Sequence, residues 1–307
     1  MSVEHVRAFD TRREEGERLY LLLDPLTDHD EAGPLSRAAL VQLLGEDAVM
    51  IVPREDLAHS THACPILADL SSAADEVRRA LLETSAAQAA DEAARSRRYV
   101  CGWLISALDP ASLALYLAGM HGMGDASGRN HFFPIHEPLR LELLAAADMA
   151  YATQRLGPVR EWLVPGSHGG VVLLKGAANG EGPRSLTPIA LEALDEAPRV
   201  AAVLAAWRGA LRSNASGALL PRNAARDAFV QIHRAKTQSR LRDHDDIATL
   251  AINGVIRHPR LHESPEVAAL IERAARGEAP LADLFSTLHD ARWTYIVSGL
   301  SPASTAP

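Results

Sequence analysis

The sequence predicts a mixed α/β region followed by a region made of helices alone. In residues 1–178, short apolar runs typical of buried strands are interleaved with segments whose apolar residues recur at helical spacing. Beyond residue 184 the pattern is helical throughout. The length of 307 residues also suggests two domains, at about 150 residues each. We therefore expect a mixed α/β domain at 1–178, an all-α helical domain at 184–300 and a flexible tail at 301–307.

The strands of the first domain are expected where apolar runs end at Asp, Pro or Gly. The run Tyr99–Ser106 is the strongest of them, because it is apolar on both of the faces that a strand presents. The last two runs flank Pro-Gly-Ser-His-Gly-Gly and are expected to form a hairpin. The expected strands are residues 18–24, 48–52, 64–70, 99–106, 131–136, 159–164 and 171–174.

Helices of the first domain are expected between these strands, over residues 35–44, 73–95, 110–120 and 138–155. Gly45 should end the first helix. Asp109 and Pro110 should begin the third, since Asp is a good N-cap and Pro suits the first helical turn. The glycine-rich stretch 119–129 is expected to be a loop.

A polar, glycine-rich linker is expected at residues 176–184, between the two domains. The helices of the second domain should follow Thr187, Pro198, Pro221, Asp243, Ser264 and Pro280. In the last of them Leu281, Leu284, Phe285 and Leu288 would share one face.

Composition bears on the partners and the compartment. There are 31 basic and 39 acidic residues, a formal charge of −8, which argues against nucleic acid or a membrane surface as a partner. The two cysteines, Cys64 and Cys101, lie in apolar runs and fit a reducing compartment. Neither a signal peptide nor a membrane-spanning run is evident. We expect a cytoplasmic protein without a cofactor.

The strongest candidate for chemistry is the set His233, His244 and Asp245, which invites comparison with metal-dependent phosphohydrolases. A simpler interpretation is that Asp243 caps a helix whose first turn carries Asp245 and Asp246. We expect capping, no metal site and no catalytic residue, with the phosphohydrolase as the alternative. A third hypothesis, a regulatory domain with a ligand pocket near the glycine-rich stretch, also stays open.

An ordered series of short motifs resembles the adaptor-chaperones of type VI secretion systems. The series opens at Leu19-Tyr20-Leu-Leu-Leu-Asp24-Pro25 and continues at Cys64-Pro65-Ile-Leu67 and Gly102-Trp103-Leu-Ile-Ser106. It ends with His131-Phe-Phe-Pro-Ile-His-Glu137-Pro138-Leu-Arg140, Gly157-Pro158 and Trp162. The motif residues singled out, as structural or partner-binding positions, are Tyr20, Asp24, Pro65, Gly102, Trp103, Ser106, Glu137, Pro138, Gly157, Pro158 and Trp162.

Two positions depart from the family pattern. The family's arginines around the aromatic-Asp-Pro motif are absent near Pro134 and Leu139, and Tyr116 stands where the family has a histidine. The resemblance implies a non-catalytic cytosolic chaperone. It would bind the N-terminal region of a secreted toxin effector and load it onto the spike protein (VgrG) or the tip protein (PAAR). The helical domain is expected to choose the cargo.

Overall fold

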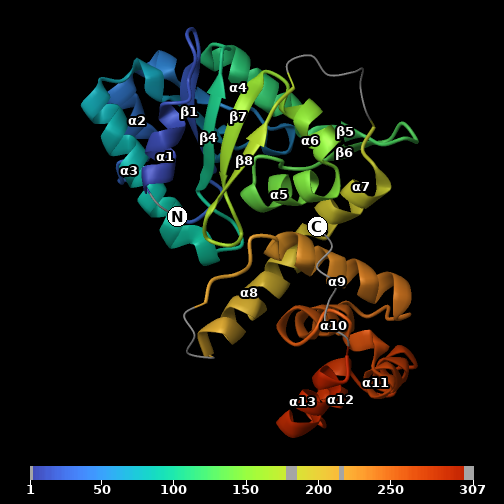
Figure 1. The fold of residues 1–307 in the computed structure, drawn as a ribbon. Helices are drawn as coiled ribbons and strands as arrows, with labels where there is room; N and C mark the ends of the chain where they lie inside the picture. Colours follow the sequence, from blue (N-terminus) through green and yellow to red (C-terminus); the bar gives the residue numbers. More distant parts are fainter. Residues whose placement is uncertain (1–2, 178–184, 214–217, 301–307) are drawn as a thin grey trace. The chain divides into compact units, whose positions relative to one another are not determined.

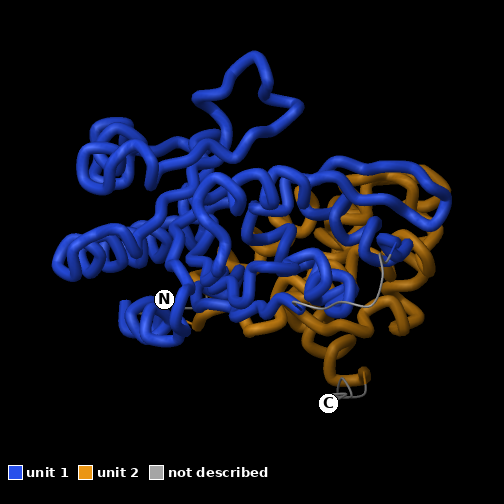
Figure 2. The backbone as a smooth tube through the Cα atoms, turned by 90° about the horizontal axis from the view of Figure 1, so that it is seen from above, with its two compact units in different colours: residues 1–197 blue, residues 198–307 orange. Residues whose placement is uncertain are grey.

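The computed structural model describes residues 3–177, 185–213 and 218–300. It divides into two compact units, residues 1–197 (unit 1) and residues 198–307 (unit 2), shown in Figure 2. Unit 1 is a mixed α/β structure and unit 2 is helical, which confirms the predicted fold class.

Unit 1 is built on a six-stranded sheet with the strand order β2-β3-β1-β4-β7-β8 (Figure 1). Every paired neighbour in it is antiparallel. The strands are β1 (Arg18–Leu23), β2 (Val49–Ile51), β3 (Ile66–Asp69), β4 (Val100–Ser106), β7 (Val159–Pro165) and β8 (Val171–Lys175). Each coincides with a predicted run, and β7 and β8 form the predicted hairpin.

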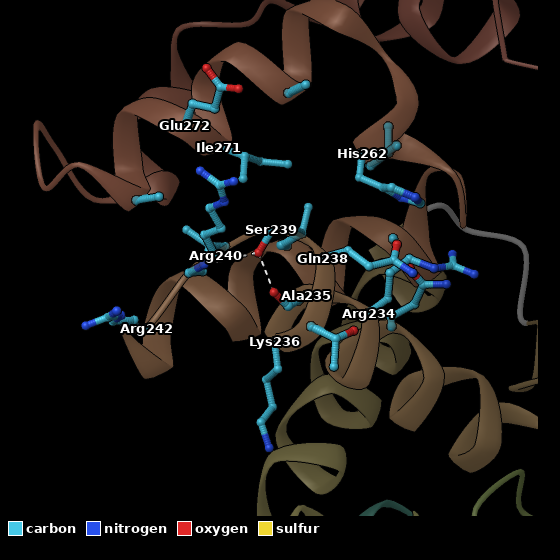
Figure 3. A pocket seen from close by; sticks show the side chains of 18 of the residues that line it. Arg234, Ala235, Lys236, Gln238, Ser239, Arg240, Arg242, His262, Ile271 and Glu272 are labelled. Atoms are coloured by element: carbon cyan, nitrogen blue, oxygen red, sulfur yellow. Dashed lines mark hydrogen bonds between the residues drawn. The ribbon is translucent and has the colours of Figure 1, made fainter.

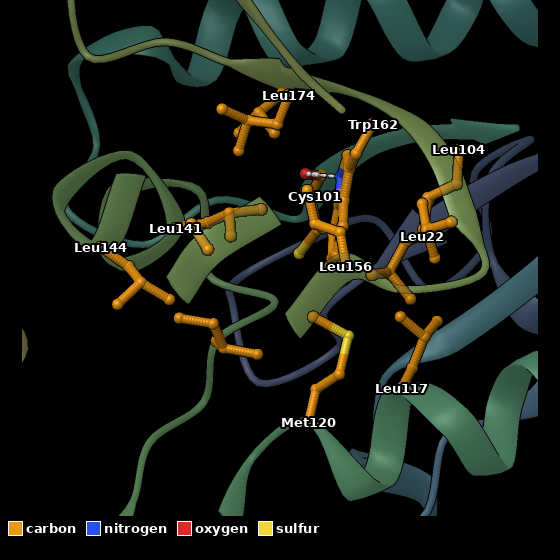
Figure 4. Close-up of a cluster of buried hydrophobic side chains, with 14 of the residues drawn as sticks. Leu22, Cys101, Leu104, Leu117, Met120, Leu141, Leu144, Leu156, Trp162 and Leu174 are labelled. Carbon is orange, nitrogen blue, oxygen red and sulfur yellow. Dashed lines mark hydrogen bonds between the residues drawn. The ribbon is translucent and has the colours of Figure 1, made fainter. Parts of the chain in front are cut away.

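Helices cover both faces of this sheet (Figure 1), which explains why residues 19–23 of β1 and 100–105 of β4 are buried on both faces and almost all apolar. On one face, Leu19 and Leu21 pack with α1 (Val3–Asp10), α2 (Arg37–Leu44) and α3 (Asp75–Asp91). On the other, Tyr20 and Leu22 pack with α4 (Pro110–Gly119), α5 (Pro138–Ala147) and α6 (Met149–Leu156). Figure 4 shows this second cluster around Trp162. The helix α1 has no counterpart among the predicted elements.

Three predicted elements of unit 1 differ from the structure. The strand expected over 131–136 is confined to β6 (Asn130–Phe132). The helix expected over 138–155 is two helices, because the backbone at Asp148 leaves the helical region and its side chain accepts a hydrogen bond from the Tyr151 N–H, capping α6. The glycine-rich stretch is more regular than expected, since β5 (Gly122–Gly124) pairs with β6 (Asn130–Phe132) in a separate two-stranded sheet.

The division between the units lies later in the chain than the expected linker. Residues 178–184 of that linker fall outside the described residues, and helix α7 (Pro188–Asp195) belongs to unit 1. Leu186, Ala190 and Leu194 are buried in the same core as Trp162. In addition, the Arg140 guanidinium on α5 donates a hydrogen bond of 2.6 Å to the carbonyl of Leu194. Apolar burial therefore joins α7 to the sheet domain.

Unit 2 contains the helices α8 (Ala197–Ser213), α9 (Ala224–Gln238), α10 (His244–Ile256), α11 (Pro265–Ala275), α12 (Leu281–Ser286) and α13 (Asp290–Ser298). The predicted starts near Pro198, Asp243, Ser264 and Pro280 are confirmed. The helix that was expected to be the last, α12, ends at Ser286, so Leu288 lies beyond it. A further helix, α13, then follows. One short 3-10 helix, η6 (Leu261–Glu263), also belongs to unit 2.

The described part of unit 1 contains further short 3-10 helices, namely η1 (Glu46–Ala48), η2 (Glu55–Leu57), η3 (Thr61–Ala63), η4 (Leu70–Ser72) and η5 (Glu92–Ala94).

Gly102 lets β4 pass close to Trp162. Its φ of 137° disfavours any other residue, and the β1–β4 register is irregular here, between Leu22 and Leu23. A Cβ at this position would lie 2.5 Å from the Leu163 carbonyl oxygen and 2.6 Å from Trp162 Nε1. Both neighbours are fixed, since the Trp162 N–H donates to the Cys101 carbonyl at 3.4 Å (Figure 4).

We predict that Gly102→Ala lowers the free energy of unfolding by at least about 2 kcal/mol, because backbone strain and steric overlap both oppose the methyl group. Urea unfolding followed by tryptophan fluorescence measures the change. Gly119→Ala is the matched control, since a Cβ there meets no atom within 4 Å and α4 would gain helix propensity. Equal stability of Gly102→Ala and the parent chain would contradict this account.

Candidate functional site

The motif residues gather at three places in unit 1. Asp24, Glu137 and Pro138 lie beyond the end of β1 and at the start of α5. The second group surrounds the C-terminal end of β4, where hydrogen bonds and close packing involve Tyr20, Ser106, Gly157 and Pro158. Pro65, Gly102, Trp103 and Trp162 lie in or beside the sheet.

A buried chain of polar side chains follows the end of β1. His121 Nε2 lies 3.1 Å from His136 Nδ1, and His136 Nε2 lies 3.4 Å from a carboxylate oxygen of Asp24. All three side chains are almost completely buried. Within the described residues, His121 Nδ1 has no hydrogen-bond partner. The Asp24 carboxylate also accepts from the Leu26 N–H, so it closes the turn that follows β1.

The protonation states of this chain follow from burial and from neighbouring charge. Burial, then the positive fields of His136 and Arg54, lower the pKa of His121 to about 3. Burial opposes ionisation of Asp24, but the contact with His136, the hydrogen bond from the Leu26 N–H and the charge of Arg97 together outweigh it and lower the pKa of Asp24 below its usual 3.8. Burial raises the pKa of the nearby Cys101 thiol well above 9.0, so this thiol is protonated and a poor nucleophile.

Glu137, which follows His136 in the sequence, forms ion pairs with two arginines. It accepts from Arg97 at 2.9 Å and from Arg140 at 2.9 Å. Arg140 in turn holds α7 through the Leu194 carbonyl. Glu137 thus ties the start of α5 to the segment before β4 and to α7, which is a positioning role. Pro138 is the first residue of α5 and is buried.

The second group forms a hydrogen-bonded corner. The Tyr20 hydroxyl donates to the Leu108 carbonyl, and the Ser106 hydroxyl donates to the Pro158 carbonyl at 2.9 Å. Gly157 adopts φ 45° directly beneath Tyr116, whose hydroxyl donates to the Arg155 carbonyl at 2.9 Å. Tyr116, the departure from the family pattern, is therefore part of this corner.

The third group is structural. Trp103 and Trp162 are fully buried on opposite faces of the sheet, and the Trp103 N–H donates to the Ser85 hydroxyl at 3.0 Å. The Pro65 carbonyl accepts from the Val52 N–H at 2.8 Å and extends the pairing of β2 with β3. These residues build the framework and leave their polar atoms engaged inside it.

The candidate metal residues do not meet in the structure. Asp243 caps α10, as predicted, by accepting from the Asp245 N–H at 2.9 Å and the Asp246 N–H at 3.1 Å. His244 contacts Arg199, whereas the ring of His233 lies 6.1 Å from the ring of Phe229 on α9, at a tilt of 41°. Over residues 3–177, 185–213 and 218–300, no group of three or more His, Cys, Asp or Glu side chains is arranged to hold a metal ion.

Unit 2 contains a hollow of about 1060 Å³ that no motif indicated. It lies between α9, the segment 239–242, α10, η6 and α11 (Figure 3). We call it the cationic hollow, because its lining includes the basic residues Arg234, Lys236, Arg240, Arg242 and Arg276 and a single acid, Glu272. The sequence signal was present as the basic run Arg234-Ala-Lys-Thr-Gln-Ser-Arg-Leu-Arg242, but the run does not show that a cavity lies beside it.

Comparison of the chain with protein-family models, with curated proteins and with solved structures gives no match. The resemblance to type VI adaptor-chaperones thus rests on the quoted motifs. No helix in the described part of the chain is both long and apolar enough to cross a membrane. Cys64 and Cys101 are buried and free.

The neutral state of His121 predicts an acid-sensitive unit 1. The unfolded chain takes up this proton near pH 6.5, whereas the buried imidazole takes it up only near pH 3. The stabilisation is therefore complete above pH 6.5 and falls as the pH drops below it, by about 1.4 kcal/mol at roughly pH 5.5. Unfolding in urea across this pH range measures the loss.

His121→Gln should flatten this pH dependence, because an amide does not titrate. His62→Gln is the matched control, since His62 is exposed and its replacement should leave the slope unchanged. An identical slope for His121→Gln and the parent chain would refute the assignment.

The capping of α10 gives a separate prediction. Asp243→Ala should lower the free energy of unfolding by about 1 kcal/mol, because two backbone N–H groups lose their acceptor. Asp245→Ala should cost less, as it removes only a favourable charge at the first turn. Elemental analysis of the native protein separates capping from the alternative. Near-stoichiometric transition metal, lost in His244→Ala and Asp245→Ala, would support the phosphohydrolase instead.

Proposed function

We propose that this protein is a cytoplasmic, non-catalytic adaptor-chaperone that binds a type VI secretion effector and helps to load it onto the spike or tip protein. The observation that carries the proposal is where the motif series falls. From Tyr20 to Trp162, every quoted motif maps onto unit 1, and most onto its central strands or their immediate connections. A framework shared by a family would concentrate its common residues in this way.

The chemistry of the motif residues supports a structural role. The polar groups of Tyr20, Ser106 and Glu137 form hydrogen bonds within unit 1. The Cys101 thiol is protonated and therefore a poor nucleophile. Such bonds fix the strand ends and helix starts on which a binding surface depends. The loading step would use this unit, and it would engage neither nucleic acid nor a membrane.

Unit 2 is the better candidate for choosing the cargo. Its helices enclose a hollow whose lining combines apolar and charged side chains, which suits recognition of a protein segment. Unit 1 and unit 2 would then divide the work, with the sheet domain serving the machine and the helical domain selecting the effector.

Co-expression with the toxin encoded beside this chain tests the proposal. We expect the toxin to co-purify with the tagged protein, since a standard interface buries about 800 Å² per partner. We also expect export of the toxin to fall when the adaptor is absent. A toxin from another gene cluster of the same machine is the control, and it should not be retained. A toxin that is stable, exported at normal levels without this protein, and never captured by it would overturn the proposal.

A further inference from the structure

The cationic hollow carries positive charge that the protein itself leaves uncompensated. Arg240 and Arg242 are exposed, and neither guanidinium forms an ion pair or hydrogen bond with the described residues. The neighbouring Asp243 carboxylate is already engaged by two N–H groups at the start of α10. Arg276 is paired with Glu278, and Arg234 donates to the Pro259 carbonyl at 2.5 Å, so Arg240 and Arg242 are the lining arginines left to face an anion. This contrasts with the charge of −8 on the whole chain.

These cations come from different segments, as Figure 3 shows for Arg234, Arg240 and Arg242. Basic residues in the last turn of a helix favour its dipole, and that could account for Lys236 alone. The helix dipole does not explain Arg242, which follows the helix. It also does not explain why residues of α11 line the same hollow. Burial and the charge of Arg234 also lower the pKa of His262 in the same lining, as expected where the local potential is positive.

Arg240 adopts a backbone conformation that favours glycine. It has φ 61° and, among the described residues, it is the non-glycine residue with positive φ. It stands just after the end of α9, where Gly is the common choice because a Cβ is disfavoured in the left-handed region. An arginine at this position strains the chain locally and places a guanidinium at the hollow, a combination typical of ligand-binding positions.

The lining of the hollow is mixed and mainly polar. Leu250, Leu261 and Ile271 contribute apolar atoms but are almost fully buried, and Gln231 offers an amide. The volume is slightly above the usual range for ligand pockets, about 300–1,000 Å³, so a single inorganic anion would leave most of it empty. A short peptide could occupy more of it and place its carboxylates on the exposed arginines.

We propose that the cationic hollow binds an acidic peptide segment of the cargo protein, with carboxylates on Arg240 and Arg242. The proposal rests on the adaptor function for the identity of the cargo, but the site itself can be tested alone. Arginine suits this task, since its planar fork pairs with a carboxylate through two hydrogen bonds.

The first test uses the full chain and a fluorescein-labelled peptide of alternating Glu and Leu, followed by fluorescence anisotropy. The same peptide with Gln in place of Glu is the ligand control, and inorganic phosphate is the competitor. We expect the Glu peptide to bind, the Gln peptide to bind at least about tenfold more weakly, and affinity for the Glu peptide to fall as salt is raised. Equal binding of both peptides would overturn the proposal, as would phosphate binding without peptide binding.

Charge reversal then locates the site. Arg242→Glu should weaken the Glu peptide at least about tenfold, because it replaces an attraction by a repulsion. Arg226→Glu is the matched control, since Arg226 is an exposed arginine of α9 outside the hollow. Arg240→Gly should weaken the peptide without lowering the melting temperature, because glycine relieves the left-handed backbone. Peptide affinity unchanged in both hollow variants would refute the site.

The same variants separate this proposal from the adaptor function. If the wild-type chain captures the adjacent toxin and Arg242→Glu does not, the hollow holds the cargo. If Arg242→Glu captures the toxin as well as the wild type does, the proposal is wrong and the adaptor function stands. If the wild type captures no toxin, the adaptor function fails; peptide binding would still support the site, but not its assignment to that cargo.

Discussion

The burial of β1 and β4 on both faces is the constraint on which the rest of unit 1 depends. Leu19 and Leu21 pack beneath one helical layer, while Tyr20 and Leu22 pack beneath the other. Each buried leucine of this kind contributes about 1.5–3 kcal/mol, so neither layer can be removed without exposing the strand. Both helical layers follow from this requirement.

The close approach of β4 to Trp162 is the second consequence of that burial. Only a residue without a Cβ allows the Leu163 carbonyl and the indole of Trp162 to lie against β4 at residue 102. The packing also buries a line of polar side chains from Asp24 through His136 to His121, in which His121 Nδ1 has no hydrogen-bond partner among the described residues. These side chains position the loops that follow β1. They also make unit 1 sensitive to acid, because the buried imidazole of His121 resists protonation.

The two units offer different materials for recognition. In unit 1 the polar groups of the motif residues bond within the framework, whereas in unit 2 Arg240 and Arg242 have no partner among the described residues and lie beside the cationic hollow. An acidic chain with a local basic hollow can repel anions generally and still accept one that presents its carboxylates in the right place. Under the proposed function, this contrast would let one framework be combined with a selective cargo site.

The sequence by itself determined the six strands of the main sheet and the fold class, because short continuous apolar runs such as Leu19–Leu23, ended by Asp24 and Pro25, are typical of buried strands. It also determined the cap at Asp243, since capping is a local hydrogen bond. Only the tertiary structure decided that α7 belongs to the sheet domain, that Asp148 divides the helix over 138–155, and that Arg234, Arg240 and Arg242 line a cavity with α11. The physical reason is that these features depend on contacts between segments distant in the chain or on competition between local caps, and neither leaves a periodic signal in the sequence.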